Sequence, residues 1–242
     1  MTEAHDWITL HRVRFNSAID GTDLPIAGPA NAEAWRFYPA SPIGENGVRT
    51  SISDEWGGIG IYADRASAEA VFAAPESYLP FLGQTVEAWH ALLLPVTHRG
   101  DVNWRGSVQS GSTVKVASDD PGGPLAVLTS AGYSDPGPED IPRIRTFLAG
   151  VERVRDFYAT LPGNVRRTVF SGAGVDGHDG LTVSLWQDDG AMLAAAYSDG
   201  VHREQMDAHR KSAMFDRSSF TRARILSSKG AWDGTDPVAQ MA

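Results

Sequence analysis

The stretch that decides the fold is residues 181–234, LTVSLWQDDGAMLAAAYSDGVHREQMDAHRKSAMFDRSSFTRARILSSKGAWDG. It begins as a strand whose apolar side chains alternate over residues 181–186. After a turn, small and apolar residues recur at helical spacing from Ala191 onward, which predicts a helix. Residues 220–226 alternate again as a strand, which stops at the glycine–tryptophan–glycine corner 230–234. The stretch therefore predicts one strand–helix–strand unit that closes on a corner.

The first half of the chain repeats this layout. Residues 59–72 read as strand, turn and helix, and residues 86–96 read as a strand. The matching positions are Asp64 and Asp188 at the turns, with Gly100, Trp104 and Gly106 against Gly230, Trp232 and Gly234 at the corners. Two copies of one unit predict a pseudo-symmetric pair of halves. We place them at residues 1–110 and 120–242, with a polar boundary between them.

The second half contains a full set of elements. A strand at 125–129 precedes a helix at 140–161, which carries a buried apolar stripe and ends at a proline–glycine pair. A strand at 165–170 then leads into the unit described first, so the order is β-α-β-β-α-β, that of the ferredoxin-like fold. The first half lacks the first helix, because residues 16–32 carry proline and glycine where that helix would lie. The sequence predicts an α+β chain of two fused ferredoxin-like halves, the first of them abbreviated.

Composition narrows the class of partner. The chain has 242 residues, with 30 acidic and 21 basic side chains and a formal charge of -9. This charge disfavours nucleic acid and anionic membranes as partners. The absence of cysteine excludes disulfides and thiolate metal sites, and no stretch is apolar enough to span a membrane. We expect a cytoplasmic protein that acts on a small molecule, and the fold also allows a homodimer.

Signature motifs of nucleotide-binding, hydrolase and metalloprotease sites do not occur in the sequence. The most suggestive polar set is on the predicted helix of the second half, which we expect to be continuous. There His202 and His209 are seven residues apart, which places both on one side of the helix, with Arg210 beside them. Spacing of this kind is typical of a solvated or packed helix face as well as of a ligand pair, so both interpretations stand at this point.

A family resemblance adds to this interpretation. The run 183–192, then His202, Arg210 and Phe215, followed by 220–224 and the corner 230–234, resembles the carboxy-terminal half of the spheroidene monooxygenase family of carotenoid biosynthesis. In order and spacing the similarity extends over residues 33–235. It implies a dimeric α+β-barrel fold, related to the antibiotic-biosynthesis monooxygenases, and an oxygenase that uses haem.

The resemblance also implies roles for particular residues. His202 would be the metal ligand and Arg210 would meet a haem propionate, so these two are the catalytic candidates, with His209 the first alternative ligand. The apolar wall of the cofactor site would be formed by Trp186, Met192 and Phe170.

The leading hypothesis is thus a haem-dependent, monooxygenase-like enzyme that acts on an apolar small molecule. Two alternatives remain open. One is a cofactor-free oxygenase or isomerase of the same fold, in which a histidine takes a substrate proton. The other is a non-catalytic carrier of haem or of a small molecule. The sequence does not identify the substrate.

Overall fold

The structure is a computed structural model, which describes residues 5–20, 24, 28–40, 50–100, 114–133, 136–171, 179–197, 200–211 and 214–241. Three features that the sequence singled out lie outside these ranges: the glycine-rich loop 44–47, the glycines at 172 and 174, and the first-half corner residues Trp104 and Gly106.

Eight strands form one antiparallel sheet. They are β1 (Trp7–Asp20), β2 (Ala34–Pro39), β3 (Ile52–Tyr62), β4 (Thr85–Gly100), β5 (Leu125–Gly132), β6 (Asn164–Ser171), β7 (Asp179–Trp186) and β8 (Arg217–Gly230). Their order in the sheet is β2-β3-β1-β4-β8-β5-β7-β6. Read outward from the centre of the sheet, the two halves have the same strand order: fourth, first, third and second, counted along each half. The two fourth strands, β4 and β8, pair with each other at the centre.

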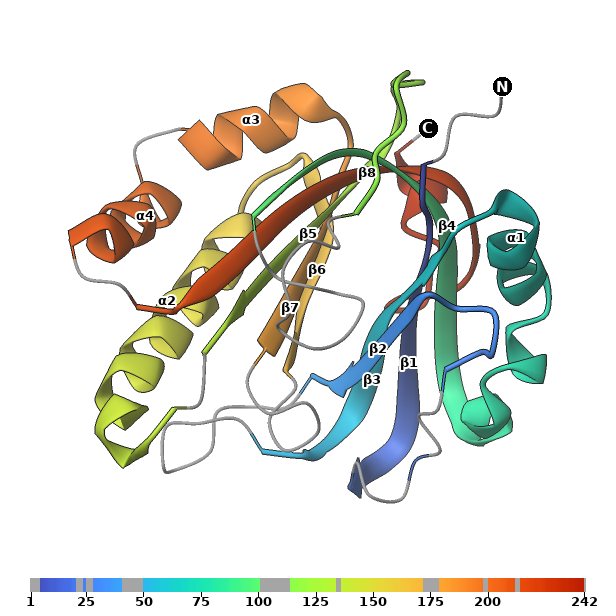
Figure 1. Cartoon of the computed structure of the whole chain (residues 1–242), viewed down its shortest axis with the longest axis horizontal. Coiled ribbons are helices and arrows are strands. Elements are labelled where there is room, and N and C mark those ends of the chain that lie inside the picture. Colours follow the sequence, from blue (N-terminus) through green and yellow to red (C-terminus); the bar gives the residue numbers. More distant parts are fainter. Residues whose placement is uncertain are drawn as a thin grey trace.

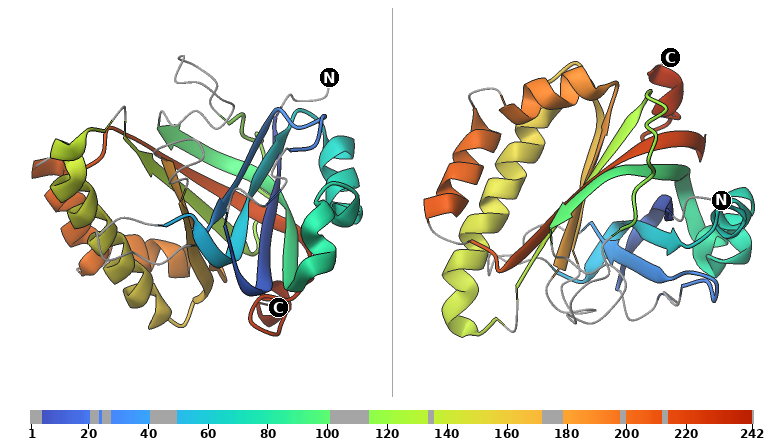
Figure 2. Two further views of the ribbon diagram at one scale, coloured as in Figure 1. Left: turned by 90° about the horizontal axis from the view of Figure 1, so that it is seen from below. Right: turned by 45° about the horizontal axis from the view of Figure 1, so that its top comes forward.

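The helices cover the outer sides of this sheet (Figure 1). They are α1 (Arg65–Ala73), α2 (Ile141–Ala159), α3 (Asp189–Tyr197) and α4 (Val201–Lys211), with short 3-10 helices at η2 (Pro75–Ser77), η3 (Pro80–Gln84), η4 (Pro138–Asp140) and η5 (Val238–Gln240). Helix α1 lies on the flank of the first half, whereas α2, α3 and α4 lie together on the flank of the second (Figure 2). None of the helices in the described ranges is long and apolar enough to cross a membrane.

Two aspartates begin corresponding helices in the two halves. Asp64 accepts a hydrogen bond from the backbone N–H of Ser67 at 2.8 Å, before α1. Asp188 accepts one from the backbone N–H of Ala191, also at 2.8 Å, at the start of α3. In both cases a carboxylate satisfies a backbone donor that has no partner within the helix. The turn residues that the sequence matched are therefore helix caps.

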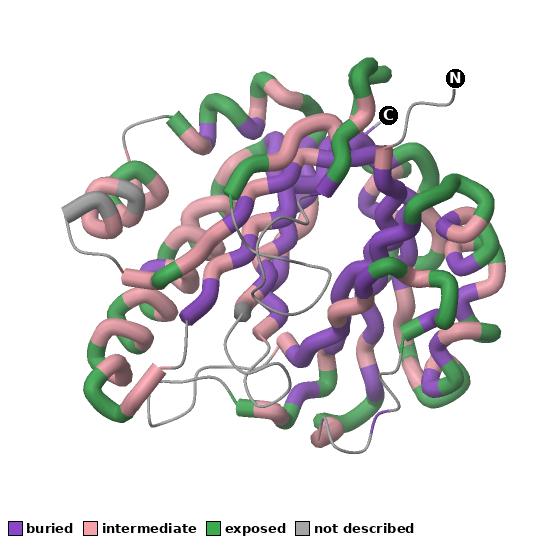
Figure 3. The backbone as a smooth tube through the Cα atoms, in the orientation of Figure 1, coloured by how far each residue is buried: buried purple, intermediate pink, exposed green. Residues whose placement is uncertain are grey.

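The core lies on the inner face of the curved sheet. Buried apolar side chains come from both halves, among them Ile8, Leu10, Ile61, Leu93, Leu128, Phe170, Val183 and Ile225. Figure 3 shows the buried residues concentrated in the strands, whereas most residues of the helices are half-buried or exposed. Trp232 belongs to this core and packs on Trp89 with ring centroids 5.5 Å apart. The second-half corner therefore caps the core that the halves share.

Side chains join the two edges of the sheet. Edge strand β2 contacts edge strand β6, and no ladder pairs them in the part of the chain described. Thr168 of β6 donates to Glu55 of β3 at 3.1 Å. Glu55 in turn lies 3.2 Å from the guanidinium of Arg12, which is buried and also pairs with Glu87. A buried charge network thus connects the strands on both sides of the gap.

Three expectations need correction. Strand β3 begins at Ile52, well before residue 59, where the sequence placed the start of this strand. The predicted continuous helix after β7 is divided into α3 and α4, and Gly200 lies between them. The apolar stripe of α2 is half-buried rather than buried, since Gly150 is the one residue of this helix that is buried.

Candidate functional site

His202 lies in the first turn of α4, on the side that meets α3. Its Nδ1 atom is 3.2 Å from the backbone oxygen of Ala196 in α3. A carbonyl oxygen accepts but does not donate, so Nδ1 carries the proton. In the neutral ring the lone pair then lies on Nε2. A backbone acceptor on one nitrogen is the usual device by which proteins orient a histidine that ligates a metal or takes a proton.

The surroundings of His202 keep its ring neutral. Burial lowers the pKa of His202 below its ordinary value, although the bond to Ala196 opposes this. At neutral pH the imidazole is therefore uncharged and keeps its lone pair. This is the state that iron ligation or general-base catalysis requires.

Aromatic rings connect His202 to the sheet. The ring of Tyr158, on α2, stacks against His202 with centroids 6.0 Å apart. Tyr158 also meets Trp186 of β7 edge-to-face at 5.0 Å. Trp186 is buried beside Met192, and its indole N–H donates to Ser184 at 2.9 Å. His202, Trp186 and Met192 therefore belong to one layer, between the sheet and the helices.

His209 has a different environment. Its Nδ1 atom accepts a hydrogen bond from the backbone N–H of Met214 at 3.1 Å. Its ring stacks on Phe215 with centroids 3.8 Å apart and an interplanar angle of 7°. Because Nδ1 accepts, the proton of the neutral ring is on Nε2. In this arrangement neither nitrogen of His209 offers a free lone pair.

One predicted site residue, Phe170, is not brought to His202 by the structure, and the side chain of another, Arg210, is not described. Phe170 packs in the core of the inner face, where Gly57 leaves room for it, since a Cβ on Gly57 would lie 2.3 Å from the Phe170 ring. It is thus on the opposite side of the sheet from Trp186 and Met192 and cannot share a wall with them. The backbone of Arg210 is in α4, and its side chain lies outside the described residues.

Helix α2 packs against α4 and β6, and its apolar stripe is half-buried. Helix α2 crosses α4 closely at Gly150, where a Cβ would lie 1.9 Å from Gln205. The apolar stripe of α2 nevertheless stays half-buried along its length, at Ile144, Phe147, Leu148, Val151, Val154 and Tyr158. On the strands that α2 covers, Thr129, Thr182 and Ser184 share the face of Trp186.

Sequence reasoning did not identify two features of this layer. Tyr158 was assigned to the apolar stripe, and nothing in its spacing indicated that it joins His202 to Trp186. The oxygen of Ala196 is a backbone atom, so no residue type in the sequence could have indicated it.

A pair of buried histidines in contact lies in the first half. Nδ1 of His11 is 2.9 Å from Nδ1 of His90, and Nε2 of His11 is 2.8 Å from the hydroxyl of Thr9. Thr9 in turn bonds Tyr62 at 3.4 Å. Burial lowers the pKa of both histidines, that of His90 to about 4. The pair is neutral, its two Nδ1 atoms pair with one another and Nε2 of His11 pairs with Thr9, so it has the features of a structural network.

Among the described residues, no three histidine, aspartate or glutamate side chains converge on a point where they could hold a metal ion. A haem site would need a different arrangement, because one axial side chain and an apolar pocket can hold the group.

Comparisons with known proteins give a fold and a partial sequence match. No family model matches the chain. Over 59 residues it is 36% identical to spheroidene monooxygenase of Rhodobacter capsulatus, and this match spans about a quarter of each protein, 24% of this chain and 24% of the relative. The resemblance seen in the sequence is thus supported over part of its length.

Solved structures agree over the whole chain. An aldoxime dehydratase, OxdRE, in complex with butyraldoxime has a TM-score of 0.58 at 11% identity, covering 98% of this chain and 85% of its own. Another aldoxime dehydratase has a TM-score of 0.54 at 9% identity, covering 93% and 83%. At such identities the similarity concerns the fold alone. The predicted fold class, two ferredoxin-like halves in a dimeric α+β-barrel arrangement, is confirmed.

Proposed function

We propose that this protein is a haem-dependent, monooxygenase-like enzyme that acts on an apolar small molecule in the helix layer of its second half. The observation that carries the proposal is the hydrogen bond between Nδ1 of His202 and the oxygen of Ala196, which leaves the lone pair on Nε2. The partial match to spheroidene monooxygenase supports the reaction class.

The residues of this layer fit a haem. His202 supplies one neutral imidazole, and the stripe of α2 supplies apolar surface that is only half-buried in the described part of the chain. Trp186, on β7, and Met192, on α3, are buried apolar residues of this layer. Haem, when bound, would supply the iron that activates dioxygen or peroxide.

The roles of the chain's own residues follow from their contacts. His202 would hold the iron through Nε2, and the Ala196 oxygen would fix the ring and raise its basicity. Tyr158, between His202 and Trp186, would keep the imidazole in place and exclude water from it. The tautomer of His209 makes it the weaker candidate for the iron ligand. Arg210 remains our candidate for a propionate contact on the basis of the family resemblance alone.

A second function has support from the same observation. A neutral imidazole with a free lone pair is also a general base, so a cofactor-free oxygenase or isomerase would use His202 to take a substrate proton. Haem binding separates the two functions, because only the first requires the group.

The test is a haem reconstitution of three proteins. We expect the parent to give a Soret band and one haem per chain, His202→Ala to lose both, and His209→Ala to keep them. Alanine preserves helix propensity in α4, and circular dichroism checks that each variant folds. A folded His202→Ala protein with an unchanged Soret band would overturn the assignment of the ligand. A parent that takes up no haem would overturn haem dependence and favour the cofactor-free function. If haem is bound, turnover of dioxygen or peroxide distinguishes an enzyme from a carrier.

A further inference from the structure

Two buried donors at the other end of the same helix layer have no hydrogen-bond partner in the described part of the chain. One is the hydroxyl of Tyr133, just after β5, a residue that is 6% exposed. The other is the Nε atom of Arg143, in the first turn of α2. Buried polar groups in proteins nearly always have partners, so two orphaned donors at one place point to a missing acceptor.

Nε is the nitrogen of Arg143 that the two neighbouring aspartates do not bind. Its Nη1 donates to Asp216 at 2.6 Å and its Nη2 to Asp140 at 2.9 Å. Both Nη atoms thus have a partner, and Nε is the one nitrogen of this guanidinium that lacks a partner in the described part of the chain. The guanidinium also lies over the ring of Tyr133, with its carbon 5.2 Å from the ring centroid. The two orphaned donors therefore belong to side chains in contact.

The charges around these donors select the kind of acceptor. Two carboxylates already offset the single positive charge of Arg143. The charge of Arg143 is therefore already paired and is not left to attract an anionic ligand, so a neutral oxygen acceptor fits the two donors better. Burial raises the pKa of Tyr133, which keeps its hydroxyl protonated and able to donate.

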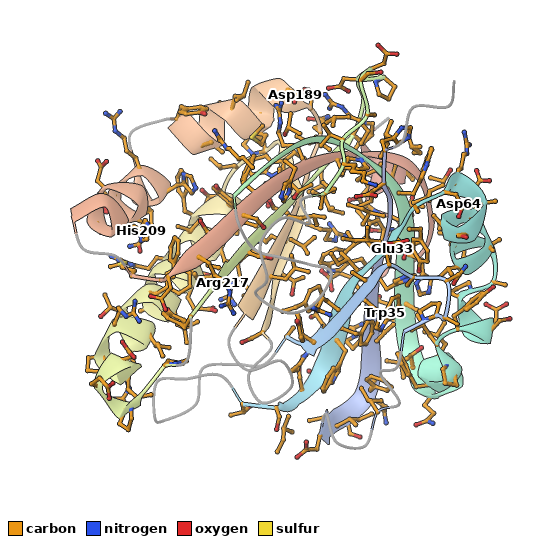
Figure 4. The ribbon with its side chains drawn as sticks, in the orientation of Figure 1. Glu33, Trp35, Asp64, Asp189, His209 and Arg217 are labelled. Carbon is orange, nitrogen blue, oxygen red and sulfur yellow. The ribbon has the colours of Figure 1, made fainter. Side chains whose placement is uncertain are left out.

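Aromatic rings surround the same place. Phe147 of α2 meets Tyr133 edge-to-face at 6.2 Å and Phe215 at 5.0 Å. Phe215 stacks on His209. In Figure 4, His209 on α4 and Arg217 at the start of β8 mark this end of the layer. Rings of this kind bind flat, unsaturated groups by stacking and edge contacts.

From these observations we infer that Tyr133 and Arg143 form a recognition site for a neutral carbonyl oxygen, and that the substrate is a flat, unsaturated molecule that bears one. The inference rests on the proposed function in taking the helix layer of the second half as the substrate side. It deepens that function by naming a substrate class and two residues that select it.

The test uses 9-fluorenone and fluorene, two flat probes that differ in one carbonyl group. Equilibrium dialysis gives the dissociation constant of each, and the readout is their ratio. A neutral hydrogen bond contributes about 1 kcal/mol, so we expect Tyr133→Phe to weaken fluorenone binding about 5-fold and to leave fluorene binding unchanged. Arg143→Lys, which keeps a cation between the two aspartates but lacks Nε–H, should act in the same direction. Tyr78→Phe, in the first half, should change neither constant.

Two outcomes would overturn the inference. One is a ratio that Tyr133→Phe leaves unchanged, as expected if a buried water alone occupies the donors. The other is a loss of stability of more than about 1 kcal/mol in ligand-free Tyr133→Phe, which would mean that the hydroxyl has a partner within the protein. The haem test is separate, since it reads the Soret band of His202 variants. If the ratio of dissociation constants changes and the protein takes up no haem, the recognition site is supported and haem dependence is not. If the protein takes up haem and the ratio is unchanged, haem dependence is supported and the recognition site is not.

Discussion

Gly100 and Gly230 hold equivalent places at opposite ends of the β4–β8 ladder. Gly100 ends β4 opposite Ser219, and Gly230 ends β8 opposite Trp89. Both have positive φ, +105° and +89°, and a Cβ on either would lie 2.1 Å from a backbone oxygen of the neighbouring strand. The same backbone device therefore ends the fourth strand of each half, as expected of a pseudo-symmetric pair.

We predict that Gly230→Ala destabilises the protein by more than the strain of a positive φ. That strain costs on the order of 1–3 kcal/mol for a residue with a side chain. At Gly230 the added methyl group also meets the oxygen of Ala88, so the strand end must move. Urea denaturation measures the change in the free energy of unfolding.

The matched control is Gly122→Ala. Gly122 has φ of +72°, but no atom lies within 4 Å of the position of its Cβ. We expect it to lose about 1 kcal/mol from the backbone alone. If the two variants lost the same free energy of unfolding, the close approach to the Ala88 oxygen at Gly230 would not contribute to the loss.

The buried network at the sheet edges gives a second prediction. Arg12 is 1% exposed, and its removal in Arg12→Met would leave Glu55 and Glu87 without their shared cation. Breaking a buried ion pair from one side typically costs about 3–5 kcal/mol. We expect a loss of this size in the free energy of unfolding.

An exposed pair of the same residue types is the control. Arg65 and Glu69 form an i,i+4 pair on α1, with side chains 61% and 45% exposed. Because exposed pairs contribute little, Arg65→Met should cost no more than about 1 kcal/mol. If Arg12→Met cost as little as this control, the network would not hold the edges together.

The third prediction concerns acid. His11 and His90 are buried and neutral, and burial lowers the pKa of His90 to about 4. In the unfolded chain a histidine titrates near 6.5, so between these values the unfolded state binds more protons. Stability is therefore complete above about pH 6.5 and falls as the pH decreases toward 4. His90 alone should account for on the order of 3 kcal/mol at pH 4.

One variant tests whether the His11–His90 pair causes this loss of stability in acid. His90→Gln retains a polar group beside His11 but removes one titrating ring. We expect it to be less stable than the parent at pH 7 and to lose less of its remaining stability between pH 7 and pH 4. Equal losses for the two proteins over that range would place the acid sensitivity elsewhere.

The sequence was a good guide to the fold because local signals and the repeat agreed. Alternation located the strands, and Asp64 and Asp188 cap the helices where their turns predicted. The described residues of the segment 16–32 contain no helix, as its proline and glycine predicted. Gly200 lies where the long predicted helix is divided, and a glycine there indicates a helix end. The sequence still predicted one helix because the apolar periodicity continues on both sides of Gly200.

The site was less predictable, because it depends on which face of the sheet each residue takes. Trp186 and Met192 were expected in one wall with Phe170, yet alternation within a strand does not say which face meets the helices. The difference between His202 and His209 depends on backbone groups, a carbonyl in one case and an N–H in the other. Contacts of this kind arise only when the helices have packed.

The different backbone partners of His202 and His209 give the last prediction. In the protein without cofactor at neutral pH, His202 should carry its proton on Nδ1, since its partner is a carbonyl oxygen. His209 should carry its proton on Nε2, since its Nδ1 accepts from Met214. Long-range nitrogen–proton correlation spectra of the ring-labelled protein distinguish the two tautomers, and the variants His202→Ala and His209→Ala assign the signals. Two histidines with the proton on Nε2 would remove the reason for preferring His202, since Nε2 would then not be free on either ring to bind iron or to take a proton.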